Sequence, residues 1–382
     1  MANGTVYRRD DRKKPWVVHV SWLEGDRRRQ SKKSYSTKKE AQEALATAID
    51  AHRRQDFVAP TDLRVRDFVD TWLHALETQG RKVTTVTGYR QAMKNWVLPH
   101  LGAHKLQDLR ATDLDKLYAD LLRAGGVGGR PLSMTTVHHV HTLMGKMLHD
   151  AERKGLVVRN VARLADAPSM AAARDRAPEM NVWSPDELSR FLRHVENYRA
   201  GALVHLAAMT GMRRGELVAL RWDAVDLARS TVTVRVAASF LGGVERVEVP
   251  KTKRSRRTID LDQRTASILK RHRATQREEL FELGITTPTD DRVFTNEVGD
   301  PMRPHSVGQA FNRLVKSSGL PRIRLHDLRH THASHLLAAG VNAKVVSERL
   351  GHSSVSFTLD TYGHVMPGRQ SEAAEAAAAL LS

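Results

Sequence analysis

The sequence contains no cysteine in its 382 residues. Disulfide bonds, thiolate zinc sites and a cysteine nucleophile are therefore excluded. The chain also lacks an apolar run of about 18 residues, and no apolar stretch follows its N-terminal charges. Neither a membrane-spanning helix nor a secretory signal is expected, so these absences predict a cytoplasmic protein with no membrane partner.

Acidic residues are too few to balance the basic ones. Lysine and arginine together number 61, against 43 aspartates and glutamates, and the formal net charge is +18. Such an excess of positive charge attracts polyanions, and nucleic acid is the first candidate. A membrane-surface protein can also be basic, but the missing apolar segments argue against that alternative. The hydrophobic fraction of 41% allows each of two or three domains to bury a core.

Composition and periodicity predict three domains and a fold that is mainly α with small β-sheets (α+β). Residues 1–58 combine a strand near 16–22 and a highly charged strand or turn near 27–36 with a helix that begins in a capping box at Thr37. Residues 62–167 carry three apolar stripes at helical spacing and predict an all-helical domain. An aperiodic segment around 168–182 leads to a capping box at Ser184 and Glu187, which is expected to begin the first helix of a third domain, assigned to 178–382. It is mostly helical, with a small sheet built from residues 231–236 and from later strands near 247–249 and 259–261.

The first domain is the most basic part of the chain. Its strands interleave arginine and lysine with tryptophan and tyrosine. This pattern favours contact with DNA phosphates, and a solvated charged face is the alternative interpretation.

The third domain holds four histidines and an arginine within the ten residues HDLRHTHASH, 326–335. His326 and His330 are four residues apart on a predicted helix, a spacing that can bind zinc. A zinc hydrolase of this kind also needs a glutamate base, as in H-E-x-x-H, whereas Asp327 stands here and no third ligand follows in a recognisable pattern. The sequence therefore predicts no metal site. His326 and Arg329 share a helix face, which favours a clamp for phosphate oxygens.

Three further motifs strengthen the phosphate interpretation. In TGMRRGEL, residues 210–217, Arg213 follows a glycine at a predicted helix start, and Glu216 is well placed to orient an arginine. In PKTKRSRRTIDL, residues 250–261, Lys251 lies at a strand end, and Lys253 is the alternative. The third motif is RLGHSSVSFTLDTYGHV, residues 349–365, which contains a histidine and a tyrosine ten residues apart.

In combination, the T-G-x-R-x-x-E-L, H-x-L-R-H and L-G-H-S…Y-G-H motifs resemble those of the tyrosine recombinase (phage integrase) family. The resemblance spans the third domain and implies a site-specific DNA recombinase, the integrase of a temperate phage or integrative element. It also implies an arm-type DNA-binding domain at 1–58, a helical core-binding (SAM-like) domain at 62–167 and a catalytic domain at 178–382. The implied catalytic residues are Arg213, Lys251, His326, Arg329, His352 and Tyr362.

The family's reaction exchanges one phosphodiester for another, and these side chains suit it. Arg213 and Arg329 would bind the two non-bridging oxygens and stabilise the charge that develops in the transition state. Tyr362 would attack the phosphorus and form a 3′-phosphotyrosine intermediate. Because an ordinary phenol has a pKa of about 10, it needs a proton acceptor, and His326 is expected to be that acceptor or a hydrogen-bond partner of the phenol.

The remaining residues of the set complete the reaction. His352 would donate to a phosphate oxygen, and Lys251 would protonate the departing 5′-oxygen, so no cofactor or metal is required. The other histidines of the segment are expected outside this chemistry. His330 is expected to point to another face and support the fold, and His332 and His335 are expected to be buried or capping residues.

The resemblance also implies partners and alternatives. The expected partner is double-stranded DNA carrying core and arm attachment sites, bound by a homotetramer in the nucleoid of a bacterial host. An excisionase or a host DNA-bending protein would set direction. An Ala-rich helix at Ser371–Ser382 would pack on a neighbouring protomer. The alternatives are a topoisomerase, a chromosome or plasmid dimer resolvase, a non-catalytic DNA-binding regulator, and a metal nuclease, which the lack of clustered carboxylates disfavours.

Overall fold

The structure is a computed structural model of the chain. It describes residues 3–11, 13–24, 27–53, 58–175, 181–242, 244–248, 256–285, 291–363, 366 and 378–379. The chain divides into two compact units, residues 1–178 and 179–382. Helices predominate and the sheets are small and antiparallel, so the predicted fold class is confirmed.

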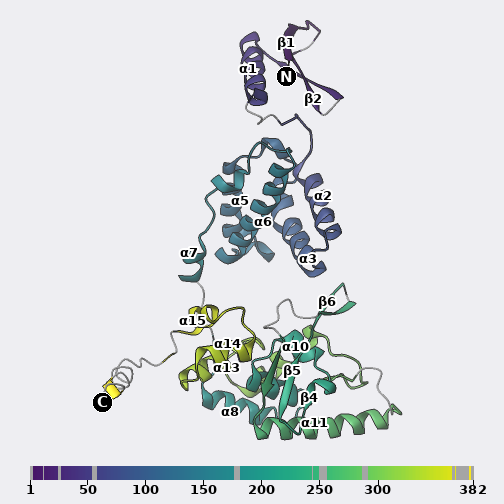
Figure 1. Ribbon diagram of the computed structural model, residues 1–382, viewed down its shortest axis with the longest axis vertical. Helices are drawn as coiled ribbons and strands as arrows, with labels where there is room; N and C mark the ends of the chain where they lie inside the picture. The colour runs from purple at the N-terminus through teal and green to yellow at the C-terminus, as the bar shows by residue number, and fades with distance from the viewer. Residues whose placement is uncertain are drawn as a thin grey trace. The chain divides into compact units, whose positions relative to one another are not determined.

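The first unit begins with a three-stranded antiparallel sheet in the order β1 (Asn3–Arg8), β2 (Trp16–Glu24), β3 (Arg27–Tyr35). Helix α1 (Lys38–Arg53) packs against it, as Figure 1 shows. Val18, Val20 and Trp22 on β2 meet Ala41 on α1 in a small core. The expected capping box is present, because Thr37 Oγ1 accepts from the Glu40 N–H while Glu40 Oε2 accepts from the Thr37 N–H. Strand β1 was not predicted, since its sequence is short and largely polar.

The side of this sheet away from α1 carries positive charge. His19 lies opposite Lys32 in the β2–β3 register, on the face opposite to Val18 and Val20. Arg28 shares this face, and its Nη2 donates to Ser21 Oγ over 3.4 Å. Arg28 and Lys32 are exposed. The sheet therefore packs α1 on one face and presents Arg28 and Lys32 on the other.

Helices form the rest of the first unit. They are α2 (Val65–Thr78), α3 (Val83–Ala92), a π-helical turn (Met93–Val97), α4 (Leu98–Leu101), α5 (Ala111–Ala124), α6 (Met134–Arg153) and α7 (Met170–Asp175), with 3-10 turns at Leu106–Asp108, Val127–Gly129 and Val161–Leu164. The predicted stripes are confirmed, since Phe68 and Trp72 on α2 pack with Val140 and Met144 on α6 in one core. The aperiodic segment after residue 168 contains the short helix α7, which the sequence did not predict.

The second unit starts with α8 (Pro185–His194), which the predicted Ser184–Glu187 capping box begins. The elements that follow are α9 (Gly201–Thr210), α10 (Arg214–Ala219), a 3-10 turn (Trp222–Ala224), β4 (Val225–Asp226), β5 (Thr231–Val234), β6 (Ala237–Leu241), β7 (Val244–Glu248), β8 (Arg257–Asp260), α11 (Gln263–Glu282), α12 (Pro304–Ser318), α13 (Asp327–Ala338), α14 (Ala343–Leu350) and α15 (Val355–Tyr362). The strands make two sheets, β4-β5-β8 and β6-β7, rather than the one small sheet expected.

Helix α13 is central to the arrangement of the second unit. It packs against α9, α14 and α15, and Figure 1 labels α13, α14 and α15. Ala333 and Leu337 on α13 share a core with Leu350 and Tyr362, which brings the end of α15 to α13. Helix α9 ends at Gly211, whose φ of +63° and close approach to Leu350 Cδ2 leave no room for a side chain. No helix among the described residues is long and apolar enough to cross a membrane.

Candidate active site

Arg213 lies at the N-cap of α10, where its motif places it. Its backbone N–H donates to Glu216 Oε2 over 2.8 Å, and its Nη1 donates to Glu216 Oε1 over 2.9 Å. Its Nη2 donates to the Gly351 carbonyl over 3.0 Å, which ties α10 to the end of α14. The side chain is 40% exposed. Glu216 therefore orients Arg213 as the sequence suggested, and the guanidinium stays accessible.

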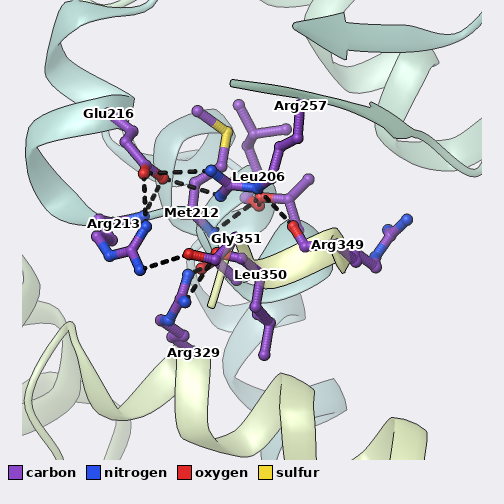
Figure 2. Close-up of polar contacts among 11 residues, drawn as sticks. Leu206, Met212, Arg213, Glu216, Arg257, Arg329, Arg349, Leu350 and Gly351 are labelled. Carbon is purple, nitrogen blue, oxygen red and sulfur yellow. Dashed lines mark hydrogen bonds and ion pairs between the residues drawn. The ribbon is translucent and has the colours of Figure 1, made fainter. Parts of the chain in front are cut away.

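A second arginine, Arg257, holds the other side of Glu216 (Figure 2). Its Nη1 and Nη2 donate to the two carboxylate oxygens of Glu216 over 3.2 and 2.9 Å, and its Nε donates to the Arg349 carbonyl over 2.6 Å. The Arg257 and Glu216 side chains are only 6% and 3% exposed. Arg257 was not among the predicted site residues because it stands among several cations of the basic segment 251–257. Strand periodicity places Arg257 on the same face of β8 as the buried Ile259, but it does not show that Arg257 meets Glu216.

Arg329 is buried on the first turn of α13. Its Nη1 donates to the Gly211 carbonyl over 2.7 Å and its Nη2 to the Leu350 carbonyl over 2.8 Å. Burial and the nearby Arg213 lower the pKa of Arg329 to about 9, so the group remains cationic at neutral pH. The two contacts use two of the five N–H groups of a guanidinium.

Arginine side chains gather near one carboxylate at this site. Arg213 and Arg257 both hold Glu216 (Figure 2), and Arg329 lies close enough for the charges of Arg213 and Glu216 to act on it. Burial opposes the ionisation of Glu216, but the hydrogen bonds and charges of Arg257 and Arg213 outweigh it and lower the Glu216 pKa. Three arginines therefore lie near one ionised carboxylate. Arg213, whose side chain is accessible, can meet an anionic group there, and bidentate guanidinium donors suit a phosphate.

His352 and Tyr362 lie beside the arginines. Their rings are stacked, with centroids 6.3 Å apart, and both residues are buried. His352 Nδ1 is 2.7 Å from Thr358 Oγ1. Burial and the cations Arg329 and Arg213 lower the pKa of His352 to about 3. Burial raises the pKa of Tyr362 to about 12, although Arg329 opposes the rise. The phenol is therefore neutral and needs a proton acceptor before it can attack.

His330 is where the sequence interpretation was wrong. Its Nδ1 lies 2.7 Å from the hydroxyl oxygen of Tyr362, so it faces the site rather than another side of the helix. The expectation failed because helical spacing shows which residues share a side of α13, but it does not show which neighbouring element packs on that side. The packing of α15 on α13 brings Tyr362 to His330, 32 residues away in the chain.

His326 precedes α13 and remains exposed. Its ring meets the His330 ring edge to face, with centroids 5.2 Å apart. Partial burial, His330 and Arg329 lower the pKa of His326 to about 4, so its imidazole is neutral at pH 7. It therefore borders the same cluster as Arg329 and His330, as its motif indicates.

His332 and His335 have structural contacts, as the sequence predicted. Buried His332 accepts at Nε2 from Arg349 Nε over 3.1 Å, and burial lowers its pKa to about 3. His335 Nε2 lies 2.8 Å from the Trp183 carbonyl oxygen. Within the described part of the chain, no group of three or more His, Asp or Glu side chains could hold a metal ion.

Two predictions fall outside the described residues. Lys251 and its alternative Lys253 lie in a segment that the structure does not describe, between β7 and β8. Of the predicted C-terminal helix Ser371–Ser382, only residues 378–379 are described, and they are helical. Five of the six predicted catalytic residues are therefore placed, and these five lie around one cluster.

Comparison with known proteins identifies the family of the chain. Residues 181–369 match the phage integrase family, and residues 65–122 match the N-terminal SAM-like domain of phage integrases. The chain belongs to the phage integrase family of tyrosine recombinases. It is a site-specific recombinase. The dimer-resolvase and regulator alternatives are not favoured.

The relatives of this recombinase align over most of their length. The ICEBs1 integrase of Bacillus subtilis is 27% identical over 346 residues, covering 89% of each chain. The integrase of Streptomyces ambofaciens is 28% identical, covering 92% of this chain and 90% of its own. A tyrosine recombinase XerC-like protein of Caldanaerobacter subterraneus is 26% identical, with 89% of each chain covered.

Solved structures show the same fold at lower identity. The integrase of the Tn1549 transposon, in complex with a circular intermediate DNA, has a TM-score of 0.67 at 18% identity and covers 84% of this chain and 100% of its own. A lambda integrase dimer bound to a COC′ core site has a TM-score of 0.59 at 15% identity and covers 94% of each chain.

Proposed function

We propose that this recombinase is the integrase of a temperate phage or integrative element and that it acts through a 3′-phosphotyrosine at Tyr362. The observation that carries the proposal is the position of Tyr362, whose ring lies on His352 and close enough to Arg329 for its charge to act on the phenol. A nucleophile beside the cationic Arg329 suits attack on an anionic phosphodiester. Relatives named integrases in Bacillus and Streptomyces support the assignment to a mobile element.

The arginines bind and activate the phosphate in this proposal. Arg213 and Arg329 bind its two non-bridging oxygens, and both interactions strengthen as charge builds in the pentavalent transition state. Glu216 and Arg257 hold Arg213 in place, so its donors need little reorganisation during the reaction. Tyr362 then bonds to phosphorus as the bond from phosphorus to the 5′-oxygen breaks.

The histidine and lysine donors complete the step. If the Thr358 hydroxyl donates to His352 Nδ1, the proton of the neutral ring is on Nε2, which can donate to a phosphate oxygen. Lys251 protonates the departing 5′-oxygen, with Lys253 as the alternative. A 5′-hydroxyl of a second duplex reverses the step and joins new strands. One phosphoester replaces another, so the reaction consumes no ATP and needs no cofactor.

The proposal assigns DNA contacts to the predicted domains 1–58, 62–167 and 178–382. The exposed cations Arg28 and Lys32 on the open sheet face suit the phosphates of an arm site. The helical domain and the catalytic domain take the core site. A homotetramer on DNA exchanges the strands, and an excisionase or host DNA-bending protein sets the direction. The place of action is the bacterial nucleoid in the cytoplasm.

The test is a covalent-complex assay with Tyr362→Phe. A suicide substrate, nicked near the cleavage point, traps the adduct in the parent protein, with or without a metal chelator. The Phe variant keeps the ring and removes the nucleophilic oxygen, so it should bind core DNA normally and give no adduct. An adduct of normal yield in the Phe variant contradicts the assignment of Tyr362. Loss of the parent adduct with chelator contradicts metal-free chemistry.

A further inference from the structure

We propose that His330, rather than His326, accepts the proton of the Tyr362 hydroxyl when Tyr362 attacks the phosphodiester. This inference rests on the proposed function of Tyr362 as the nucleophile. It assigns a catalytic role to the histidine that follows Arg329, outside the six residues that the motifs imply.

The geometry favours His330 directly. Its Nδ1 lies 2.7 Å from the Tyr362 hydroxyl oxygen, a normal length for a strong O–H···N hydrogen bond. The two rings are tilted by 48°, with centroids 5.7 Å apart. A general base must lie within hydrogen-bond distance of the proton it removes, and His330 does so before DNA binds. His326 instead contacts the edge or face of the His330 ring.

The phenol needs an acceptor that is already in contact. With a Tyr362 pKa of about 12, only about one molecule in 10⁵ carries a phenolate at pH 7. Tyr362 is also only 1% exposed, so bulk water has little access to the hydroxyl. A buried hydroxyl with a raised pKa transfers its proton most readily through an existing hydrogen bond, and this one ends on His330.

His330 is in the correct state to accept a proton. Burial lowers its pKa, although the Asp327 carboxylate opposes the shift, so the imidazole is neutral at pH 7. With its own proton on Nε2, the ring has a lone pair on Nδ1. Asp327, one helical turn before His330, stabilises the imidazolium that forms. The titratable and charged groups around His330 are Arg324, His326, Asp327, Arg329, His352 and Tyr362.

The transfer balances in atoms and charge. The O–H bond of Tyr362 breaks and an N–H bond forms at Nδ1 of His330. The phenolic oxygen bonds to phosphorus while the bond from phosphorus to the 5′-oxygen breaks, and that oxygen takes a proton from the general acid. When a 5′-hydroxyl later attacks the phosphotyrosine, its proton passes to the general acid, which is restored, and His330 returns its proton to the departing phenolate. The histidine is therefore neutral again at the end of the exchange.

The experiment compares His330→Asn with His330→Ala in the full chain. The asparagine Oδ1 stands close to the position of Nδ1 and can still accept a hydrogen bond, but it takes up no proton at neutral pH. His326→Asn is the matched comparison, and His305→Asn, on an exposed residue of α12, is the control for general effects. Adduct formation on the suicide substrate is measured in single turnovers from about pH 5.5 to 9.5, with core-DNA binding as the check for folding.

We expect both His330 variants to bind core DNA and to cleave about 100-fold or more slowly, the usual loss of a general base. Their rates should keep rising above the pH at which the parent levels off, because solvent must then take the proton. Added imidazole should accelerate His330→Ala, whose cavity can admit it, and should leave His330→Asn unchanged. His326→Asn should keep the pH profile of the parent.

Three results would overturn the assignment. A His330→Asn rate within about threefold of the parent would show that a hydrogen bond suffices. A rate that keeps rising at high pH in His326→Asn, but levels off as in the parent in His330→Asn, would move the role to His326. An unaltered His330→Ala would remove His330 from the reaction. If the parent forms no adduct, or Tyr362→Phe forms one, the proposed function itself fails. If the parent forms the adduct and the His330 variants form it at the same rate, only the role of His330 fails.

Discussion

Arg257 and Glu216 form a buried ion pair in which both terminal nitrogens of the arginine meet both oxygens of the carboxylate, at 3.2 and 2.9 Å. The same carboxylate holds Arg213. Glu216 therefore links strand β8, which follows the basic segment, to the start of α10. Through Arg257 Nε and the Arg349 carbonyl, the network also reaches α14. One carboxylate thus fixes the position of a predicted phosphate-binding arginine.

The first prediction concerns this pair. Arg257→Met removes one partner and leaves Glu216 with less compensation, which should lower the free energy of unfolding by about 3–5 kcal/mol. Urea unfolding of the full chain measures the change. The control is Arg271→Met, because Arg271 forms an exposed ion pair with Glu196 at 3.4 Å and should matter by less than about 1 kcal/mol. An equal loss of unfolding free energy in the two variants would show that the buried ion pair stabilises the fold no more than the exposed one.

The second prediction concerns the phosphate clamp. Arg213→Ala and Arg329→Ala should each slow cleavage of bound suicide substrate by about 100-fold or more, because each removes a preorganised donor to the transition state. Arg229→Ala is the control, since Arg229 is an 85% exposed arginine next to Asp226 and should leave the rate unchanged. Rates are measured at saturating protein, which separates cleavage from binding. A loss below about fivefold in either clamp variant would contradict its role.

The third prediction concerns the pH dependence of stability. His332 and His352 are buried, and burial lowers the pKa of each from 6.5 to about 3. Between about pH 3 and 6.5 the unfolded chain therefore binds protons at these two positions and the folded chain does not. The free energy of unfolding should fall as pH decreases through this window, by about 1.4 kcal/mol per pH unit for each histidine.

Urea unfolding between pH 4.5 and 6 tests this slope. His332→Gln keeps an acceptor for Arg349 but cannot titrate, so it should reduce the slope by the share of one histidine. His305→Gln, on an exposed residue, should leave the slope as in the parent. An identical slope in His332→Gln would mean that His332 does not stay neutral in the folded chain.

The fourth prediction concerns the open face of the N-terminal sheet. Lys32→Gln removes an exposed cation from this face and, if the face binds arm DNA, should make the salt slope of arm-site binding shallower by about 0.9. The matched control is Lys39→Gln, because Lys39 lies on the side of α1 opposite to Ala41 and Leu45, which face the sheet. Affinity for arm-site duplexes is measured over a range of salt concentrations. Equal slopes in the two variants would show that the sheet is not the arm-binding surface.

The sequence by itself determined most of the local structure. The Thr37–Glu40 and Ser184–Glu187 pairs predicted two helix starts, because a capping box satisfies backbone donors within four residues. The apolar stripe through Phe68 and Trp72 predicted a buried face, because helical periodicity alone sets it. The motif around Arg213 also predicted its place at a helix start beside Glu216, since the contact spans only three residues.

Only the tertiary structure decided which distant groups meet. Arg257 meets Glu216 across 41 residues, and His330 meets Tyr362 across 32. The periodicity of a helix or strand does not predict contacts between residues so far apart in the sequence, because these contacts depend on how β8 and α15 pack against α10 and α13. The lowered pKa values of His332 and His352 arise in the same way, since burial among cations exists only in the assembled unit. Residue type and spacing thus determined which side chains could do the chemistry, and packing decided which of them touch.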